Sequence, residues 1–413
     1  WIYNQARQIL KQHVNAGPDD ALVTTGSGMT GALMRLQEIL GLKFKERRFE
    51  DPRKKPVVFI THMEHHSNQV SWQETCADVV IIPPGADNLV DPRKLEEVLH
   101  EYQDREVKIG AFTACSNVAG IITPYHELAA IMHRNNGLCV IDFAASAPYV
   151  SIDMHPDQEE QRLDAITFSP HKFLGGPGSC GILVFDKNLH NGKPCVPGGG
   201  NVKWTNPWGE FGYTSDVEVM EDGGTPGFMQ AIRAALACVL KNEMGVTKMQ
   251  EREKHLLRKA FEAVEEMEEV EVVGGTDLSI PRIGALAFNI RGFHYNLVVR
   301  LLNDYFGIQA RGGWSCASTY SHYLFQMDSD SSLTLTNGIS NNNLTGKPGW
   351  VRLSLHPTMT DKELDYCLHA IKEIIKNGSD WASAYTYDPS NNEYMPTENQ
   401  PLSKTVEGVF ELS

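Results

Sequence analysis

The first half of the chain alternates short apolar runs with longer amphipathic stretches. The apolar runs are four to six residues long and rich in valine and isoleucine, which is typical of strands buried on both faces of a sheet. Strands are predicted at 21–25, 57–61, 79–82, 109–114, 138–142, 165–168 and 181–185, and helices at 2–13, 31–41, 93–103 and 124–135. This alternation indicates an α/β domain with a mostly parallel sheet.

The pattern changes in the second half of the chain. Residues 186–226 are rich in glycine, proline and tryptophan and show no clear periodicity, and two helical patterns follow them. From residue 284 onward, strand and helix patterns surround a polar insertion at 328–349, which indicates a smaller α+β domain. We predict a large α/β domain over residues 1–270, a small C-terminal α+β domain over 271–376 and a polar C-terminal tail over 377–413.

Charge, hydropathy and cysteine content exclude several classes of protein. Lysine and arginine number 37 against 52 acidic residues, a net charge of −15 that argues against nucleic acid and anionic membranes as main partners. No apolar run approaches the ~18 residues that a membrane span needs. The eight cysteines form no CxxC pair, so we expect neither a disulfide framework nor a zinc knuckle, and a reducing, cytoplasmic compartment.

A turn of small residues follows the first predicted strand. Thr25-Gly26-Ser27-Gly28-Met29-Thr30 lies between a strand and a helix. There, small residues let backbone N–H groups approach an anion, and the helix dipole favours negative charge. The spacing matches neither nucleotide-binding fingerprint. An ordinary helix-capping turn is the alternative interpretation.

Three histidines cluster after the predicted strand 57–61. His62, His65 and His66 lack the CxxC or HExxH context of a metal site, so we expect no metal here. An imidazole at the carboxyl end of a strand also stacks on planar heteroaromatic ligands or transfers protons.

An aspartate and a lysine follow two later strands. Asp142 closes the strand 138–142 and therefore faces the crevice where α/β sheets bind ligands. Lys172 comes thirty residues later, in Ser169-Pro170-His171-Lys172, before a glycine-rich run that permits close backbone approach. Pyridoxal 5'-phosphate requires a lysine for its Schiff base, a carboxylate facing its pyridine nitrogen and an anion cradle for its phosphate. The sequence offers all three.

The chain resembles the class V branch of the fold-type I pyridoxal-phosphate enzymes, and within it the cysteine desulfurases and selenocysteine lyases. Seven motifs occur in the family's order over about residues 1–376: MEHHSN, SNVAG, VIDFAAS, SPHKFLGG, GGTPG, RGGWSCA and VRLSL. The resemblance implies a fold-type I transferase with a large, mostly parallel sheet domain and a smaller α+β C-terminal domain.

Residue by residue, the resemblance assigns a cofactor site. Lys172 matches the Schiff-base lysine, Asp142 the partner of the pyridine nitrogen, and His65 the residue that stacks on the cofactor ring. The remaining matches are Ser27, Gly28, Ser169 and His171 at the phosphate, Asn117 beside the phenolic oxygen, and Thr225 at the phosphate of the neighbouring subunit's cofactor. The match of Thr225 implies a homodimer with shared active sites.

Two arginines and a cysteine match the family's substrate side. Arg352 matches the arginine that binds the α-carboxylate of an amino-acid substrate, a bidentate task suited to guanidinium. Cys316 matches the cysteine that accepts sulfur as a persulfide, and Arg311 is the positive charge expected near it. The resemblance therefore implies a cysteine desulfurase with alanine as product, and leaves room for a sulfur-acceptor protein as a partner.

The chain departs from the family pattern at three places. Ala145 stands where the family usually has glutamine, and the cysteine loop reads RGGWSCA where desulfurases often have RTGHHCA. A class V aminotransferase or a β-eliminating lyase therefore stays an alternative. A non-catalytic dimeric scaffold is a remote one, against which Lys172, Asp142 and His65 argue. The family's opening strand has no counterpart, so we expect a piece of the small domain to be missing before Trp1.

Overall fold

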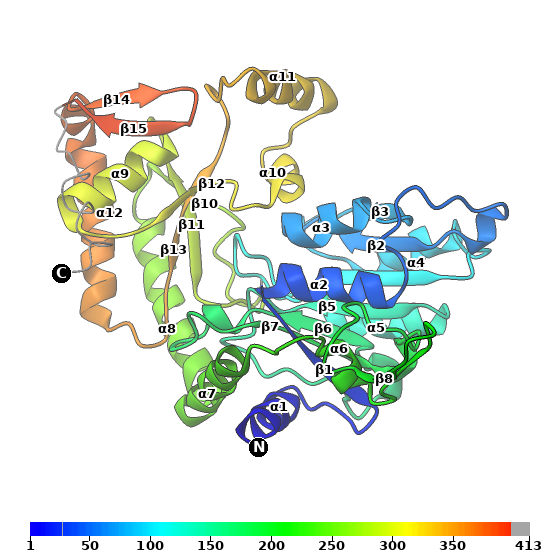
Figure 1. Cartoon of the computed structure of the whole chain (residues 1–413). Helices are drawn as coiled ribbons and strands as arrows, with labels where there is room; N and C mark the ends of the chain where they lie inside the picture. Colours follow the sequence, from blue (N-terminus) through cyan, green and yellow to red (C-terminus); the bar gives the residue numbers. More distant parts are fainter. Residues whose placement is uncertain (27, 398–413) are drawn as a thin grey trace. The chain divides into compact units, whose positions relative to one another are not determined.

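A computed structural model describes residues 1–26 and 28–397 of the chain (Figure 1). The chain divides into two compact units. Unit 1 comprises Trp1–His255, Asp277–Ala285 and Cys316–Leu324. Unit 2 comprises Leu256–Thr276, Leu286–Ser315 and the described residues from Phe325 onward. Each unit draws on segments from both sides of residue 270, and the predicted boundary between domains 1–270 and 271–376 stays a prediction.

A seven-stranded sheet forms the centre of unit 1, with strand order β1-β7-β6-β5-β4-β2-β3 (Figure 1). The pairings β2–β3, β2–β4, β4–β5 and β5–β6 are parallel, whereas β7 runs antiparallel to β1 and β6. The strands are β1 (Asp20–Thr25), β2 (Val57–Thr61), β3 (Asp78–Ile82), β4 (Lys108–Thr113), β5 (Leu138–Asp142), β6 (Ala165–Phe168) and β7 (Gly181–Asp186). Every residue of β2, β4 and β6 is buried. The predicted mostly parallel sheet is confirmed.

Unit 1 also contains helices, several of which pack against this sheet. They are α1 (Ile2–His13), α2 (Gly28–Ile39), α3 (His66–Gln73), α4 (Pro92–His100), α5 (Tyr125–Arg134), α6 (Val217–Glu221), α7 (Phe228–Met244) and α10 (Ser318–Leu324). A short hairpin of β8 (Val202–Thr205) and β9 (Phe211–Tyr213) lies between β7 and α6 in the sequence. Helix α8 (Val246–Glu265) begins in unit 1 and ends in unit 2.

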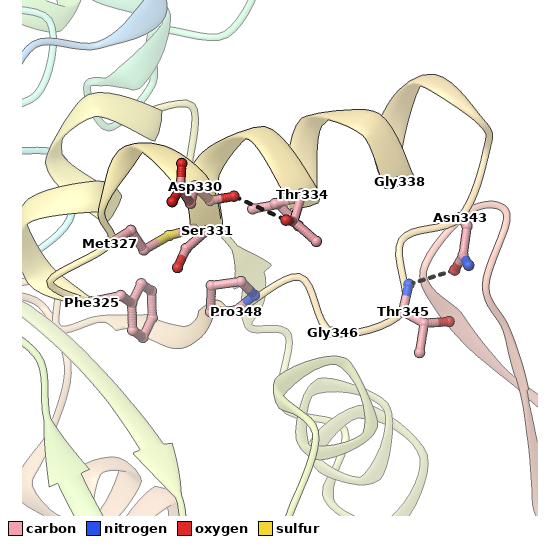
Figure 2. Close-up of a pocket in the computed structure, with 11 residues that line it drawn as sticks. Phe325, Met327, Asp330, Ser331, Thr334, Gly338, Asn343, Thr345, Gly346 and Pro348 are labelled. Carbon is pink, nitrogen blue, oxygen red and sulfur yellow. Dashed lines mark hydrogen bonds between the residues drawn. The ribbon is translucent and has the colours of Figure 1, made fainter.

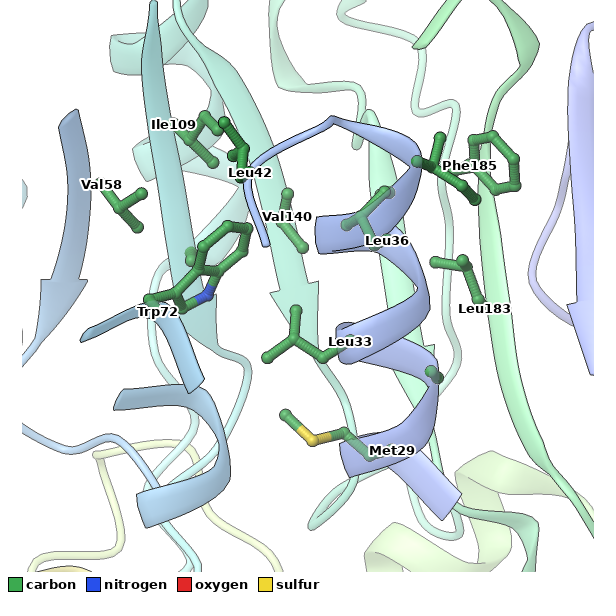
Figure 3. Packing of buried hydrophobic residues seen from close by; sticks show 14 of the residues in the cluster. Met29, Leu33, Leu36, Leu42, Val58, Trp72, Ile109, Val140, Leu183 and Phe185 are labelled. Atoms are coloured by element: carbon green, nitrogen blue, oxygen red, sulfur yellow. The ribbon is translucent and has the colours of Figure 1, made fainter. Parts of the chain in front are cut away.

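Helix α2 packs its apolar face onto the sheet and so fixes the position of its own N-terminus. Figure 3 shows Leu33 and Leu36 of α2 facing Val140 of β5 and Leu183 of β7, with Trp72 of α3 beside them. All five side chains are buried. Because this packing fixes the position of α2, the N-terminus of the helix lies at the end of strand β1.

Unit 2 is built around a four-stranded sheet of order β10-β11-β13-β12. The strands are β10 (Val270–Val272), β11 (Ala285–Ile290), β12 (Arg311–Gly313) and β13 (Trp350–Ser354). The unit also contains α9 (Tyr295–Phe306), α11 (Ser329–Ser340), α12 (Asp361–Ala382) and a hairpin of β14 (Tyr385–Asp388) and β15 (Glu393–Pro396) (Figure 1). The α+β character predicted for this part of the chain is confirmed.

Two elements lie where the sequence indicated little structure. Helix α11 occupies the polar insertion, and the β14–β15 hairpin occupies the polar tail. Asp328 caps α11 by accepting a hydrogen bond from the Ser331 N–H at 2.8 Å. An aspartate N-cap is the local signal that could have identified this helix. Within the described residues, no helix is both long and apolar enough to cross a membrane.

Candidate functional site

Two neighbouring parallel strands bring Asp142 and Lys172 to the same end of the sheet, where the carboxyl ends of these strands lie. Asp142 is the last residue of β5, and Lys172 follows β6 in the short 3₁₀ turn Pro170–Lys172. The strands pair in parallel with Asp142 opposite Thr167. Both residues therefore lie at the carboxyl end of the strands, where α/β sheets bind ligands.

The Asp142 carboxyl group is buried, and its surroundings favour a cationic partner. Its Oδ1 accepts a hydrogen bond from the Ala144 N–H at 2.7 Å. Burial raises the pKa of Asp142 to about 6, although the Ala144 N–H and the Lys172 ammonium group act to lower it. A carboxylate in so dry a place is stabilised by a nearby positive charge, such as a protonated ring nitrogen.

Three of the predicted phosphate residues converge at the start of α2. Gly28 has φ = 58°, in the left-handed region that favours glycine. The Ser169 Oγ accepts a hydrogen bond from the Met29 N–H at 2.8 Å. A Cβ atom at residue 28 would lie 2.7 Å from His171 Cε1 and 2.9 Å from Ser169 Oγ. The fold therefore brings Gly28, Ser169 and His171 together at a helix N-terminus, a location that suits a phosphate group. Ser27 lies outside the described residues.

His65 occupies a position set by helix α3. It is the N-cap residue of α3, and its Nδ1 accepts a hydrogen bond from the Ser67 N–H at 3.1 Å. This bond requires an unprotonated Nδ1, and it fixes the orientation of the imidazole ring. The backbone of the same helix therefore sets the orientation of the ring.

A second buried carboxyl group, Glu64, was missed by the sequence analysis. Its Oε1 accepts hydrogen bonds from the Thr61 Oγ1 at 2.6 Å and the Thr113 N–H at 3.0 Å, and its Oε2 accepts one from Asn68 at 2.7 Å. Burial raises the pKa of Glu64 to about 7. Glu64 thereby joins the ends of β2 and β4 to α3, directly before His65. The sequence signal that could have identified Glu64 is its position between the buried strand β2 and the pair His65-His66.

Cys316 lies against the N-terminus of α3 in unit 1. Its carbonyl oxygen accepts a hydrogen bond from the His66 N–H at 2.8 Å, and the residue is half-buried. Its φ of 60° lies in the left-handed region. Asn117 is half-buried in the turn between β4 and α5, and Thr225 is exposed between α6 and α7.

The two predicted substrate arginines are neighbours in unit 2. Arg311 of β12 pairs directly with Arg352 of β13 in the antiparallel register, which places both side chains on the same face of the sheet. Both residues line a cavity of about 280 Å³, together with Met359 and Cys367. Two basic residues therefore line this cavity.

Another cavity of unit 2 is separate from these residues. It has a volume of about 870 Å³ and lies beside α11. Figure 2 shows Phe325, Met327 and Pro348 at one end of it, and Asp330 and Thr334 of α11 along one side. None of its lining residues belongs to the predicted cofactor or substrate site.

The clustered histidines have separate partners. His62 Nε2 is bonded to the Asn88 carbonyl oxygen at 3.0 Å, whereas His66 Nε2 is bonded to Ser318. Among residues 1–26 and 28–397, no group of three or more histidine, cysteine, aspartate or glutamate side chains is placed to hold a metal ion.

Comparisons with known proteins identify relatives of the chain. A protein named "Probable cysteine desulfurase" from Halalkalibacterium halodurans is 29% identical over 331 residues, which cover 78% of this chain and 75% of the relative. A cysteine desulfurase from Escherichia coli is 29% identical over 272 residues, which cover 64% of this chain and 63% of the relative.

Solved structures show the same fold. A cysteine desulfurase from Thermococcus onnurineus NA1 has a TM-score of 0.72 at 22% identity, with 91% of this chain and 84% of that chain covered. The Escherichia coli cysteine desulfurase CsdA has a TM-score of 0.71 at 23% identity, with the same coverage. The sequence profile described as "Aminotransferase class-V" matches residues 1–367. The protein therefore belongs to the aminotransferase class V family of pyridoxal 5'-phosphate-dependent enzymes and has their fold-type I architecture.

Proposed function

We propose that the protein is a cysteine desulfurase, which removes the sulfur atom of cysteine and releases alanine. The observation that carries the proposal is the position of Cys316. This half-buried cysteine is hydrogen-bonded to α3, the helix that His65 caps, within the unit that holds Lys172 and Asp142. The relatives named cysteine desulfurases support the same reaction.

The residues of unit 1 fit pyridoxal 5'-phosphate. Lys172 supplies the amine that would hold the cofactor covalently, Asp142 the buried carboxylate, and Gly28 the floor of a phosphate cradle that a Cβ atom would fill. Ser27, Ser169 and His171 are the proposed further phosphate residues. When bound, the cofactor supplies an electron sink that weakens bonds at the substrate's α-carbon.

The remaining steps of the proposed reaction are assigned to residues of the protein. Lys172 takes the proton from the substrate's α-carbon. Asp142 keeps a positive charge on the ring nitrogen, because a buried carboxylate favours a cation beside it. His65 would pack on the cofactor ring, in the orientation that Ser67 fixes. Asn117 would hold the phenolic oxygen of the cofactor, and Thr225 would hold the phosphate of the partner subunit's cofactor.

Arg352 and Cys316 act on the substrate itself. Arg352 binds the α-carboxylate in a bidentate manner, with Arg311 adding positive charge from the paired strand. The Cys316 Sγ attacks the substrate sulfur, so that an S–S bond forms as the carbon–sulfur bond breaks. The electron pair of the broken bond stays with the carbon, which takes up a proton and leaves as alanine. Cys316 keeps the sulfur as a persulfide.

Two residues favour a second candidate, a class V aminotransferase or β-eliminating lyase. Ala145 replaces the usual glutamine, and Trp314 replaces a histidine of the cysteine loop. Trp314 is buried, and the Lys347 ammonium group lies 4.7 Å from the centre of its ring. An indole cannot transfer protons as a histidine does, so the loop differs chemically from that of typical desulfurases.

Replacing Cys316 with serine separates the two candidates. With cysteine and a thiol reductant, the wild-type enzyme is expected to release sulfide and alanine in equal amounts, measured by colorimetry and product mass. Cys316→Ser is expected to lose this activity by ~100-fold or more, because a hydroxyl group is a far weaker nucleophile than a thiolate. Cys195→Ser, at another half-buried cysteine, serves as the control and should retain full activity. Unchanged sulfide release from Cys316→Ser would refute the persulfide role.

A homodimer with shared active sites is the proposed assembly. Helix α7 follows Thr225 directly and exposes a row of apolar side chains, with Met229 73% and Leu236 62% exposed. Contiguous exposed apolar surface of this kind typically marks an interface between proteins. A second copy of the chain that covers α7 would also meet Thr225.

Replacing both Met229 and Leu236 with aspartate is expected to split the dimer. In sedimentation velocity, the wild-type protein should have twice the chain mass of 46.0 kDa, and the double variant the single mass, because buried charge destabilises an apolar interface. Leu333→Asp, at an equally exposed leucine of α11, should remain dimeric. A wild-type protein that sediments with the single mass would contradict the proposed assembly.

The proposed function also includes a cytoplasmic location and a protein that accepts the sulfur atom. All eight cysteines are free thiols, which supports a reducing, cytoplasmic compartment. A persulfide on half-buried Cys316 is placed to pass its sulfur to a thiol of an acceptor protein.

A further inference from the structure

Residues His62–Gln69, which we call the clamp, hold the segment that begins at Cys316. The His66 N–H donates a hydrogen bond to the Cys316 carbonyl oxygen at 2.8 Å. The Ser318 N–H donates one to His66 Nε2 at 3.1 Å, and the Ser318 Oγ lies 2.7 Å from the same nitrogen. His66 therefore holds both sides of the segment, with its backbone and with its side chain.

The clamp continues on either side of His66. Gln69 follows three positions later on the same face of α3, and its Oε1 accepts a hydrogen bond from the Thr319 Oγ1 at 2.7 Å. The His62 ring meets Tyr320 edge-on, with 5.6 Å between ring centroids. The contacts thus extend over successive residues of the segment.

The segment needs such support because its backbone is strained. Ser315 and Cys316 have φ angles of 53° and 60°. Two consecutive non-glycine residues in the left-handed region are uncommon, and such conformations persist only where the surroundings enforce them. The bond between His66 and the Cys316 carbonyl group acts directly on one of these residues.

We propose that His66 is a positioning residue that holds Cys316 in place through its backbone N–H and its imidazole ring. A ring nitrogen that accepts a hydrogen bond from an N–H carries no proton, so Nε2 is unprotonated when it accepts from the Ser318 N–H. When Nε2 is protonated, its N–H donates to the Ser318 Oγ at 2.7 Å, and the Ser318 N–H has lost this acceptor. The Ser318 amide is therefore held less firmly when His66 gains a proton.

The groups that face His66 leave this inference intact. The neighbouring His65 ring lies 6.2 Å away between centroids. On the clamped segment, the ionisable groups are Cys316, Tyr320, His322 and Tyr323. The His322 Nδ1 is bonded to the Ser318 carbonyl oxygen at 2.7 Å. Helix α2 contributes the uncharged Thr30, which is bonded to Ser67. The inference rests on the proposed function only for the role of Cys316, because the hydrogen bonds exist whatever the reaction is.

Amide hydrogen exchange of the loaded full-length enzyme tests the proposal. Exchange in the peptide 316–324, corrected for intrinsic rates, is measured by mass spectrometry between pH 5 and pH 8. His66→Ala is expected to raise the exchange rate at Ser318 roughly tenfold at pH 8, because the bonds to the side chain are lost. The wild-type rate should approach that of His66→Ala toward pH 5. His66→Gln should stay slow throughout, because its amide oxygen accepts a bond at any pH.

A control variant distinguishes the loss of the His66 contacts from a general effect of removing a histidine. His126→Ala removes another half-buried histidine, bonded to the Gln161 carbonyl oxygen, and should leave peptide 316–324 unchanged. Equal exchange in His66→Ala and the wild type at pH 8 would overturn the proposal, as would a constant ratio between His66→Gln and the wild type from pH 5 to pH 8. If His66→Ala does not fold, the comparison of His66→Gln with the wild type is sufficient.

Turnover measurements separate this proposal from the proposed function. His66→Ala should lower kcat for alanine release from cysteine roughly tenfold and leave KM unchanged, because the substrate contacts are intact. A wild-type enzyme that releases no alanine, but shows the expected exchange pattern, would refute desulfuration and keep the clamp. The reverse result would keep desulfuration and refute the clamp.

Discussion

Replacing Lys172 with alanine is expected to abolish turnover, with a loss of at least ~10⁴-fold, because in the proposed mechanism one side chain both holds the cofactor and transfers the proton. The ammonium group is exposed at the edge of the sheet, so the substitution should leave folding intact. Activity is measured as alanine release from cysteine. Borohydride reduction followed by peptide mass mapping should place the cofactor on the wild-type peptide that contains Lys172, and on no peptide of the variant.

Lys241 provides a sharp control for this experiment. It is buried in α7, where its Nζ donates hydrogen bonds to the carbonyl oxygens of Ala147 at 2.7 Å and Val150 at 2.5 Å. Burial lowers the pKa of Lys241 to about 8, which would favour a nucleophilic amine if the group were accessible. Cofactor fixed to Lys241, or retained by Lys172→Ala after reduction, would show that the covalent site is assigned to the wrong lysine.

Replacing Asp142 with asparagine is expected to lower turnover by ~10²–10⁴-fold, because the amide cannot keep a positive charge on the ring nitrogen. The two side chains have nearly the same shape, and the Ala144 N–H keeps an oxygen acceptor. Alanine release from cysteine measures the effect. Asp157→Asn, at an exposed aspartate, is the matched control, and turnover of Asp142→Asn within about threefold of the wild type would refute the assignment.

The stability of the cofactor-free protein at different pH values provides an independent test of the buried Asp142 carboxyl group. Its pKa is raised from 3.8 to about 6 by burial. Between these values the folded state binds more protons than the unfolded state, so stability falls as the pH rises from about 4 to about 6. The free energy of unfolding should lose ~3 kcal/mol across this window because of Asp142. Urea denaturation at several pH values should show this loss in the wild type and a smaller one in Asp142→Asn.

Much of the fold follows from the apolar pattern alone. Each predicted strand of the large sheet agrees with the structure to within one residue, because strands buried on both faces are nearly continuous apolar runs. Helix α11 escaped prediction because it exposes most of its residues and so shows no apolar period. The β14–β15 hairpin escaped because none of its strand residues is fully buried. Helix α3 was missed for a related reason, since only Asn68 and Trp72 of its residues are buried.

The residues of the candidate site also fall into two groups, those that local sequence patterns predict and those that they do not. Asp142 and Lys172 were predictable because Asp142 ends one strand and Lys172 follows the next, on the side where α/β sheets bind ligands. Glu64 was not, since an acidic residue after a strand is ordinarily exposed, and only the structure shows its bonds to Thr61 and Thr113. The bond between His66 and Ser318 joins residues 252 positions apart, a distance at which local patterns carry no information.

The surface that Gly28, Ser169 and His171 form has a consequence for synthesis of the protein. Its parts lie about 140 residues apart in the sequence, and β1, which precedes Gly28, pairs with β7 at the edge of the sheet. On the ribosome, the N-terminal strand is therefore made long before its partner. A nascent chain that ends before Ser169 lacks two of the three residues of this surface, and β1 stays without its partner until β7 has been made.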